Sequence, residues 1–212
     1  MAVRTKSLLR REQYKEIARL TIDGKILDVG GSKKSGYHEL IGGNHEIVTG
    51  NIDESYGTDL VFDAQETWPF EAASFEAVLF INLLEHLYRY DVALSESLRV
   101  LKKGGRVIGV VPFMINVHGS PNDFFRYTKS ALERELSDAG YTEVIIRAQG
   151  TGAFSVIYHC LLGFVRWYWM ATPLIAFFKG LDRIVWFLKP HNKMSAEYMP
   201  LGYYFEAKKP RV

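Results

Sequence analysis

The stretch KILDVGGSKKSG, residues 25–36, decides the fold. Its first three residues read as a short buried strand, Asp28 stands at the end of that strand, and Gly30 and Gly31 open a loop of small and basic residues. An acidic residue and glycines at the carboxyl end of a strand are typical of nucleotide-type sites in open α/β sheets. Glycines let the backbone approach a ligand where a side chain would block it.

The charge of Asp28 narrows the choice of ligand. A carboxylate beside the loop repels a pyrophosphate but attracts a ligand that carries an ammonium or sulfonium charge. S-adenosylmethionine (SAM) carries both charges. A phosphate loop fits less well, because Gly31 and Gly36 have its spacing but Tyr37 and His38 stand where Lys and Ser or Thr are required. These residues therefore predict SAM as cofactor.

Composition indicates an ordinary globular chain. With 212 residues, 48% hydrophobic and 24% charged, residues 1–212 are expected to form one α/β domain with an elaboration. The net charge of +2 is too small to indicate nucleic acid. The single cysteine, Cys160, excludes an internal disulfide and favours the reducing cytoplasm. No apolar segment follows the basic first residues, so we expect no signal peptide.

Strand and helix patterns alternate along the chain. We expect a helix at residues 7–21, a second from an Asp91 N-cap to Leu101 that Gly104 and Gly105 stop, and a third that Thr128 caps. This alternation predicts a mostly parallel, doubly wound sheet. The expected strands are residues 25–27, 46–49, 60–62, 75–81, 106–111, 144–147 and 202–207.

We expect residues 151–199 to form an apolar helical insertion before the last strand, with two or more helices over the carboxyl ends of the sheet. Its apolar runs, 153–165 and 167–178, are each shorter than the roughly 20 residues that span a bilayer. A lid over the substrate, a homodimer interface and a membrane-surface element all explain this apolarity. We favour peripheral membrane contact, because aromatic and basic residues occur together as in interfacial helices. They are Phe154, Tyr158, Trp167, Tyr168, Trp169 and Trp186 with Lys179, Arg183 and Lys189.

Residues 25–143 resemble the class I SAM-dependent methyltransferases, and closely the branch called methyltransferase type 11. The resemblance implies a Rossmann-like, seven-stranded sheet whose last strand is antiparallel. The stretch HGSPNDFFRYTKSALERELSDAGY resembles a sub-branch common among bacterial enzymes that modify surface polysaccharides and lipids. The stretches that carry the family resemblance are ILDVGG, NID, DLVFDAQETWPF, ASFEAVLFINLLEHL, SLRVLKKGGRVIGVVPF and, for the last strand, GYYFEAKKP.

The resemblance assigns roles by position. Asp28, Gly30 and Gly31 would surround the methionine portion of SAM, and Asp53 would hold the ribose hydroxyls. An acid at the end of the second strand suits ribose on general grounds as well. Beyond these, the resemblance places Asp63 and Ala64 at the adenine, Asn82 near the sulfonium, and Glu85 and His86 at the rim of the site, where we expect Glu85 to bind substrate.

Four polar residues after the fifth strand have two readings. Asp123 and Arg126 either pair to pin a loop or, with Tyr127, bind substrate. His118 or His86 could deprotonate an acceptor hydroxyl, because imidazole titrates near neutrality, and a buried, satisfied histidine is the alternative for both. No carboxylate–histidine set has the sequence spacing of a metal site, so we predict no metal.

Together these patterns predict SAM-dependent methyl transfer to a hydroxyl, carboxyl or amine of a small, lipid-linked or sugar-linked acceptor. One departure motivates an alternative, a non-catalytic methyltransferase-like fold that binds a partner. Ser32 and Lys34 stand where the family's first motif has glycines, so Gly31 or Gly36 would have to supply the lost flexibility.

Overall fold

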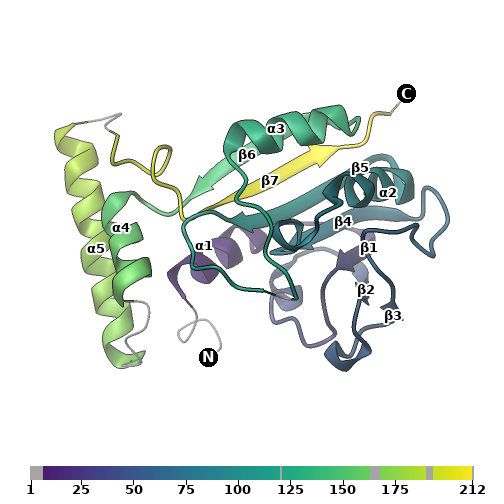
Figure 1. Cartoon of the computed structure of the whole chain (residues 1–212), viewed down its shortest axis with the longest axis horizontal. Coiled ribbons are helices and arrows are strands. Elements are labelled where there is room, and N and C mark those ends of the chain that lie inside the picture. Colours follow the sequence, from purple (N-terminus) through teal and green to yellow (C-terminus); the bar gives the residue numbers. More distant parts are fainter. Residues whose placement is uncertain (1–6, 120, 163–167, 190–192, 212) are drawn as a thin grey trace.

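The computed structural model describes residues 7–119, 121–162, 168–189 and 193–211, without the side chains of residues 162 and 168–170. Its sheet has seven strands in the order β3-β2-β1-β4-β5-β7-β6, and β7 is antiparallel to both neighbours (Figure 1). This confirms the predicted fold class. The strands are β1 Gly24–Val29, β2 His45–Asn51, β3 Leu60–Val61, β4 Phe75–Ile81, β5 Leu101–Pro112, β6 Thr142–Gln149 and β7 Gly202–Lys208.

Helices cover both faces of the sheet because successive strand residues point to opposite sides. On one face, Val78 and Phe80 of β4 belong to the cluster that buries α2 (Tyr90–Val100) and α3 (Lys129–Asp138). On the other face, Ala77 and Leu79 pack with α1 (Leu8–Ile17). Figure 1 shows α2 and α3 above the sheet and α1 below it. Short 3₁₀ helices occur at η1 His38–Leu40, η2 Glu54–Tyr56 and η3 Leu84–His86.

Three expectations about helix ends are wrong. The first helix ends at Ile17, before residue 21. Asp91 lies inside the first turn of α2, where it stabilises the positive end of the helix dipole, and Arg89 is at the N-cap position. Gly104 and Gly105 do not stop this helix, because β5 already begins at Leu101 and runs through both. The Thr128 cap is confirmed, since its side chain accepts a hydrogen bond from the Ala131 N–H.

Between β6 and β7 the chain forms α4 (Ala153–Ile157), a π-helical turn η4 (Tyr158–Leu162) and α5 (Tyr168–Leu188). These helices lie beyond the carboxyl end of β6, at the left of Figure 1. They pack against α1 in a separate apolar cluster, which includes Leu8, Leu9, Val156, Tyr158, Ile175 and Leu201. Trp167 lies outside the described residues, and so do the side chains of Tyr168 and Trp169.

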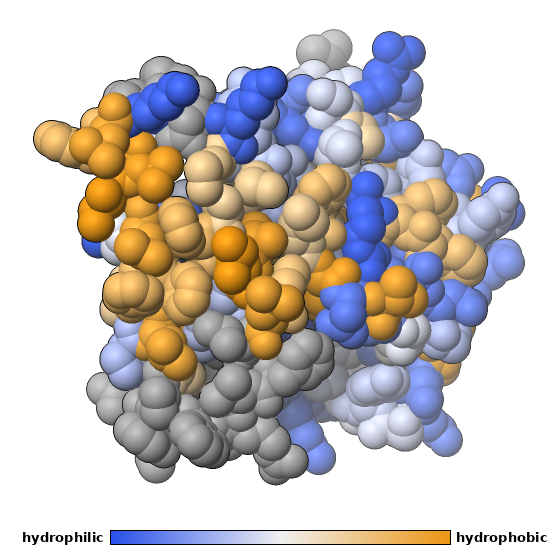
Figure 2. Space-filling model, turned by 60° about the vertical axis from the view of Figure 1, so that its left-hand side comes forward, coloured by the Kyte–Doolittle hydropathy of each residue, from blue (hydrophilic) through white to orange (hydrophobic). Residues whose placement is uncertain are grey.

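The far face of α5 presents apolar side chains to solvent. Figure 2 shows hydrophobic residues gathered on this side of the molecule. A patch of this kind on a monomer usually marks a contact surface. No helix among the described residues is long and apolar enough to cross a bilayer. The exposed large apolar residues on α5 are Phe177, Ile184, Trp186, Phe187 and Leu188, of which Phe187 is 80% exposed.

One buried carboxylate joins α5 to α4. Asp182 is 5% exposed, and it accepts hydrogen bonds from the backbone N–H groups of Phe154 and Ser155, each at 2.9 Å. The hydroxyl of Thr151 donates to it as well, at 2.8 Å. A side chain of α5 therefore satisfies amide groups at the start of α4, which α4 itself leaves without partners.

We expect Asp182→Ala to lower the free energy of unfolding by about 1–3 kcal/mol, because it leaves buried donors unpaired. Urea denaturation followed by circular dichroism measures this change. Asp138→Ala is the matched control, since Asp138 forms an exposed pair with Arg134 on α3 that contributes at most about 0.5 kcal/mol. Equal effects of the two substitutions would contradict the proposed connection.

Candidate functional site

A pocket of about 710 Å³ lies at the carboxyl ends of β1, β2 and β4. Its volume is within the range of about 300–1,000 Å³ that is usual for small-molecule sites. The residues that line it come from the turns after β1, β2, β3 and β4 and from the loop after β5. Those that the sequence predicted to be functional are Gly30, Asp53, Asp63, Ala64, Asn82 and His86.

The turn after β1 is shaped by two glycines and an asparagine. Gly30 adopts a left-handed conformation with φ of +79°, and its N–H donates to the carbonyl of Gly50 at 2.7 Å. The side-chain amide of Asn51 donates to the carbonyls of Gly30 and Gly31, at 2.9 and 3.2 Å. Sequence reasoning missed Asn51. Its position at the end of the strand beside β1 is the signal that could have found it.

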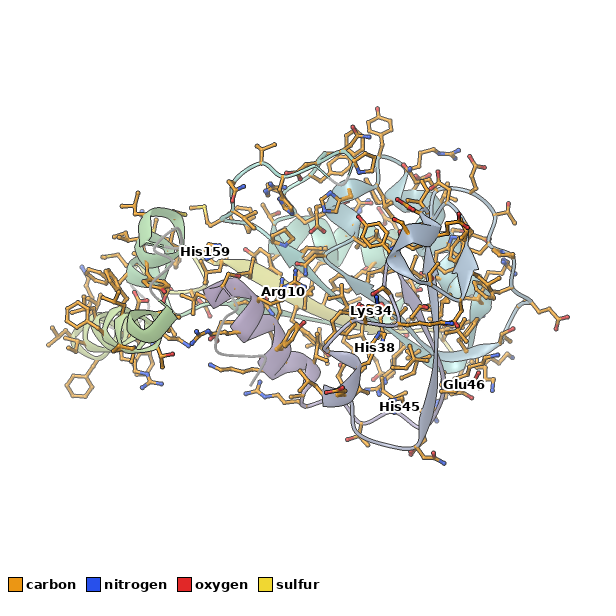
Figure 3. The ribbon with its side chains drawn as sticks, turned by 90° about the horizontal axis from the view of Figure 1, so that it is seen from below. Arg10, Lys34, His38, His45, Glu46 and His159 are labelled. Atoms are coloured by element: carbon orange, nitrogen blue, oxygen red, sulfur yellow. The ribbon has the colours of Figure 1, made fainter. Side chains whose placement is uncertain are left out.

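Asp28 lies beneath this turn and does not line the pocket. Its Oδ2 accepts a hydrogen bond from the Tyr37 hydroxyl and contacts Nε2 of His38, both at 2.7 Å. Burial raises the pKa of Asp28, and the contacts with His38 and Tyr37 partly offset that rise. Figure 3 shows His38 beside Lys34, in the segment that follows β1. The carboxylate that the resemblance assigns to the cofactor is therefore engaged by the protein's own side chains.

Gly31 is needed for space, whereas Gly36 is not. A Cβ on Gly31 would lie 1.9 Å from Oδ2 of Asp28, while a Cβ on Gly36 would meet nothing within 4 Å. Gly36 also lacks the positive φ that favours glycine, so its backbone conformation does not itself require a glycine. The conformational freedom of this turn comes from Gly30.

The residues that replace the later glycines hold the loop in place. The hydroxyl of Ser32 accepts from the N–H of Lys34 at 3.2 Å. Lys33 forms an ion pair with Asp59 at 2.6 Å, and its N–H donates to the carbonyl of Gly57. Lys33 and the Thr49 N–H lower the pKa of Asp59 to about 2. Hydrogen bonds and an ion pair therefore hold the backbone of residues 32–34, which would be more flexible with glycines.

Two further acids stand on the open side of the pocket. Asp53 follows β2, and its Oδ1 accepts from the N–H of Ser55 at 2.8 Å, a bond that lowers the pKa of Asp53. Asp63 follows β3 and accepts from the N–H of Gln65 at 2.8 Å. Among the described residues, no hydrogen bond engages the second oxygen of either carboxylate, which can accept from a hydroxyl or amine donor.

Asn82 follows β4 in a left-handed conformation with φ of +53°. Its side chain forms two hydrogen bonds with Gln13 of α1, at 2.6 and 3.2 Å. Gln13 is 1% exposed, and sequence reasoning missed it, because the helix pattern alone gives no reason for a buried amide at this position. The first helix thus supports one wall of the pocket.

Glu85 is fully buried, and neither of its carboxyl oxygens has a hydrogen-bond partner among the described residues. Burial raises the pKa of Glu85 to about 8. Its backbone carbonyl accepts from the N–H groups of Phe124 and Phe125, which joins η3 to the loop after β5. A buried acid without a partner is costly unless a ligand or a proton compensates it.

Two histidines lie beside this carboxyl group. Nε2 of His86 is 3.8 Å from Oε1 of Glu85, and the rings of His86 and His118 meet edge to face with centroids 5.1 Å apart. Nδ1 of His86 lies 2.5 Å from the carbonyl of Asn122. One ligand atom from each of Glu85, His86 and His118 lies within 4.8 Å of the others. Sequence spacing did not reveal this group, because His118 is distant from the other two in the chain.

The other predicted substrate residues take structural positions. Arg126 donates to both carboxyl oxygens of Asp123, at 2.5 and 2.7 Å, and holds the pKa of Asp123 well below its usual range. The Tyr127 hydroxyl is buried and donates to the carbonyl of Leu84 at 3.3 Å. None of these three lines the pocket. The geometry favours the reading in which Asp123 and Arg126 pin the loop.

We expect the raised pKa of Glu85 to make stability depend on pH. The folded protein retains a proton that the unfolded chain releases above a pKa of about 4.5. Stability from this group is therefore complete below about pH 4.5 and is lost as pH rises towards 8. Relative to Glu85→Gln, the wild type should lose free energy of unfolding between pH 5 and pH 8, in urea titrations with a chelator present.

Glu76→Gln is the control for this measurement. Lys102 and the Lys25 N–H lower the pKa of Glu76, so the stability that Glu76 contributes is lost only in acid. The difference in free energy of unfolding between Glu76→Gln and the wild type should therefore be constant from pH 5 to pH 8. Parallel pH curves for the wild type and Glu85→Gln would contradict the burial of an unpartnered carboxyl group.

Comparison with known proteins agrees with this architecture. Residues 50–109 match the family described as Methyltransferase domain. A curated relative, the ubiquinone/menaquinone biosynthesis C-methyltransferase of Rhizobium etli, is 36% identical over 89 residues. That match covers 42% of this chain and 29% of the relative, so the chain aligns with less than a third of the relative's length.

Solved structures share the fold over nearly the whole chain. A putative methyltransferase of Haloferax volcanii, in complex with its Trm112 activator, has a TM-score of 0.63 at 15% identity and covers 97% of this chain and 91% of its own. Phosphoethanolamine N-methyltransferase 2 of Haemonchus contortus, in complex with SAM, has a TM-score of 0.54 at 15% identity and covers 92% and 51%. The resemblance found in the sequence is confirmed: the chain has the class I SAM-dependent methyltransferase fold, and residues 50–109 carry its methyltransferase domain signature.

Proposed function

We propose that this chain binds SAM and transfers its methyl group to a small or lipid-linked acceptor. The observation that carries the proposal is the pocket at the carboxyl ends of β1, β2 and β4, where ligands bind in open α/β sheets. The fold is shared with a structure that holds SAM, and the curated relatives are named as methyltransferases.

The residues of the pocket fit this cofactor. Gly30 brings backbone to the pocket without a side chain, and Asp53 offers an exposed carboxylate for two ribose hydroxyls. Asp63 and Ala64 form the neighbouring wall, where an adenine ring would lie. Bound SAM supplies a methyl group that its positive sulfur already activates. The task of the protein is then mainly to align the acceptor.

His86 is the best-placed base for an acceptor hydroxyl. Its Nδ1 hydrogen points to the Asn122 carbonyl, so Nε2 carries a lone pair that can take a proton. His86 lines the pocket, and the loop that carries Asn122 holds its ring in place. His118 lies against His86 and is the second candidate. A hydroxyl acceptor would need such a base, whereas a neutral amine would not.

A non-catalytic binding protein is the second candidate function. The observation that favours it is the engagement of Asp28 by Tyr37 and His38, which keeps that carboxylate buried and outside the pocket lining. The replacement of the family's later glycines by Ser32 and Lys34 also favours a non-catalytic function. In this reading the pocket binds a nucleotide or a partner without methyl transfer.

Calorimetry with SAM and S-adenosylhomocysteine tests the proposal. We expect both to bind, and Asp53→Ala to weaken the binding by on the order of tenfold or more, because charge-assisted hydrogen bonds to ribose are about twice as strong as neutral ones. Asp53 is exposed, so the fold should persist.

Glu54→Ala is the matched control, because Glu54 is adjacent, exposed and outside the pocket lining. Its affinity for SAM should equal that of the wild type. If neither compound binds at millimolar concentration, the proposal of methyl transfer is overturned and the non-catalytic binding function is favoured. Unchanged affinity in Asp53→Ala would show that ribose lies elsewhere.

We also propose that α5 contacts anionic membranes, which would bring a lipid-linked acceptor to the chain. Its exposed apolar residues lie beside basic ones, as in helices that bind membrane surfaces. The protein should float with anionic liposomes, less so at high salt, and should lose this binding when Arg183 and Lys189 become Glu. Lys129→Glu with Arg134→Glu on α3 is the control and should still float.

A homodimer interface is the competing use of this face. If α5 pairs with a second copy, the protein will ignore liposomes, and light scattering will give twice the mass of the chain. Substitution of Phe187 and Leu188 by Ser would then yield a monomer. That pair of results would overturn membrane contact.

A further inference from the structure

We propose that Glu85, His86 and His118 form a binding site for one first-row divalent transition-metal ion at the edge of the pocket. Their ligand atoms lie within 4.8 Å of one another. Two imidazoles and one carboxylate are a donor set that proteins use for Zn²⁺ and Fe²⁺, with remaining positions open to water or substrate. The site is independent of whether SAM binds.

The carboxylate is prepared for a cation. Glu85 is fully buried, and both of its oxygens are without a hydrogen-bond partner among the described residues. Natural structures rarely leave a buried carboxyl group in this state, and a metal ion is one of the ordinary partners of such a group. Oε1 of Glu85 is 3.8 Å from Nε2 of His86, too far for a hydrogen bond but compatible with two ligands of one ion.

Both histidines are held in the tautomer that a metal requires. Nδ1 of His86 lies 2.5 Å from the Asn122 carbonyl, so it must carry the hydrogen and leave Nε2 with a lone pair. Nδ1 of His118 lies 3.2 Å from the Asn116 carbonyl and 3.5 Å from Oδ2 of Asp123, both acceptors. Metal-binding histidines almost always donate their other N–H to a carbonyl or carboxylate in this way.

The surrounding structure fixes the three ligands. Arg126 holds Asp123 through both carboxyl oxygens, and Asp123 also accepts from the backbone N–H of His118 at 2.8 Å. The backbone carbonyl of Glu85 accepts from Phe124. The Asp123–Arg126 ion pair does not line the pocket, but it positions His118 opposite Glu85.

The donor set and its place define the ligand class. Imidazole nitrogens favour Zn²⁺, Fe²⁺ or Co²⁺ over Mg²⁺, Ca²⁺ and Mn²⁺, which prefer oxygen ligands. His86 and Asn122 also line the pocket, so the open positions of the ion would face it. If the proposed function holds, a bound ion would occupy the lone pair of His86 Nε2, so the ion and not a histidine base would hold and activate an oxygen of the acceptor, which favours a hydroxyl or carboxyl acceptor over an amine.

Metal binding is tested on the untagged full chain after chelation and dialysis. Exposed Cys160 offers a competing thiol next to His159, so every protein carries Cys160→Ser. Equilibrium dialysis with Zn²⁺ should give one ion per chain, and Co²⁺ should develop visible absorption bands. Loss of a residue that only supports a metal ligand lowers metal affinity by about 10–100-fold. Glu85→Gln and His118→Gln, which remove ligands, should each lower the affinity for Zn²⁺ by more than that.

His45→Gln is the matched control, because His45 and Glu46 form a second adjacent histidine–glutamate pair at the start of β2 (Figure 3). The pocket lies at the other end of that strand, so this variant should bind as the wild type does. Thermal denaturation with a chelator present establishes that each variant is folded, and Zn²⁺ should raise the midpoint of the wild type but not of His118→Gln.

Three outcomes would overturn the site. They are no Zn²⁺ or Co²⁺ bound at micromolar concentration, wild-type affinity in both Glu85→Gln and His118→Gln, and an equal loss in His45→Gln. Calorimetry with SAM is a separate measurement on the same protein, so the metal site and the proposed methyl transfer can fail independently.

Discussion

The fold around the pocket depends on the burial of one carboxylate at the end of the central strand β1. Asp28 has no exposed surface, and its Oδ2 is engaged by Tyr37 and His38. The carboxylate leaves no room for a side chain at position 31. Because a buried carboxyl group is stabilised by hydrogen-bond partners, these contacts favour the path in which the segment from 30 to 38 folds back over β1. Gly30, at the base of that segment, then forms the floor of the pocket.

The sequence alone predicted the sheet well, because strand signals here are local. Residues 75–81 are all apolar apart from Glu76, and they form β4 with the predicted bounds. Helix ends were harder to predict, because the same residues can end a helix or continue into the neighbouring strand. Gly104 and Gly105 look like a helix stop but lie within β5, where a Cβ on Gly105 would be 2.8 Å from the backbone carbonyl oxygen of Lys102 and 3.0 Å from that of Glu76.

The candidate site was predicted in part, for a similar physical reason. Residues at the ends of strands, such as Asp53 and Asp63, line the pocket as expected, because parallel strands bring their carboxyl ends to one edge. Contacts between distant segments carry no sequence signal. The bond of Gln13 to Asn82 and the approach of His118 to Glu85 are of this kind.

The backbone bonds from Phe124 and Phe125 to Glu85 have a mechanical consequence. They couple the loop after β5 to η3, so these two walls of the pocket form one hydrogen-bonded unit. The loop cannot move away from η3 without breaking hydrogen bonds in the protein interior. The opposite wall is built differently. Ile52 and Tyr56 are half exposed there and carry little packing. The wall between β2 and β3, which includes Asp53, is therefore the one that can yield most easily to an entering molecule.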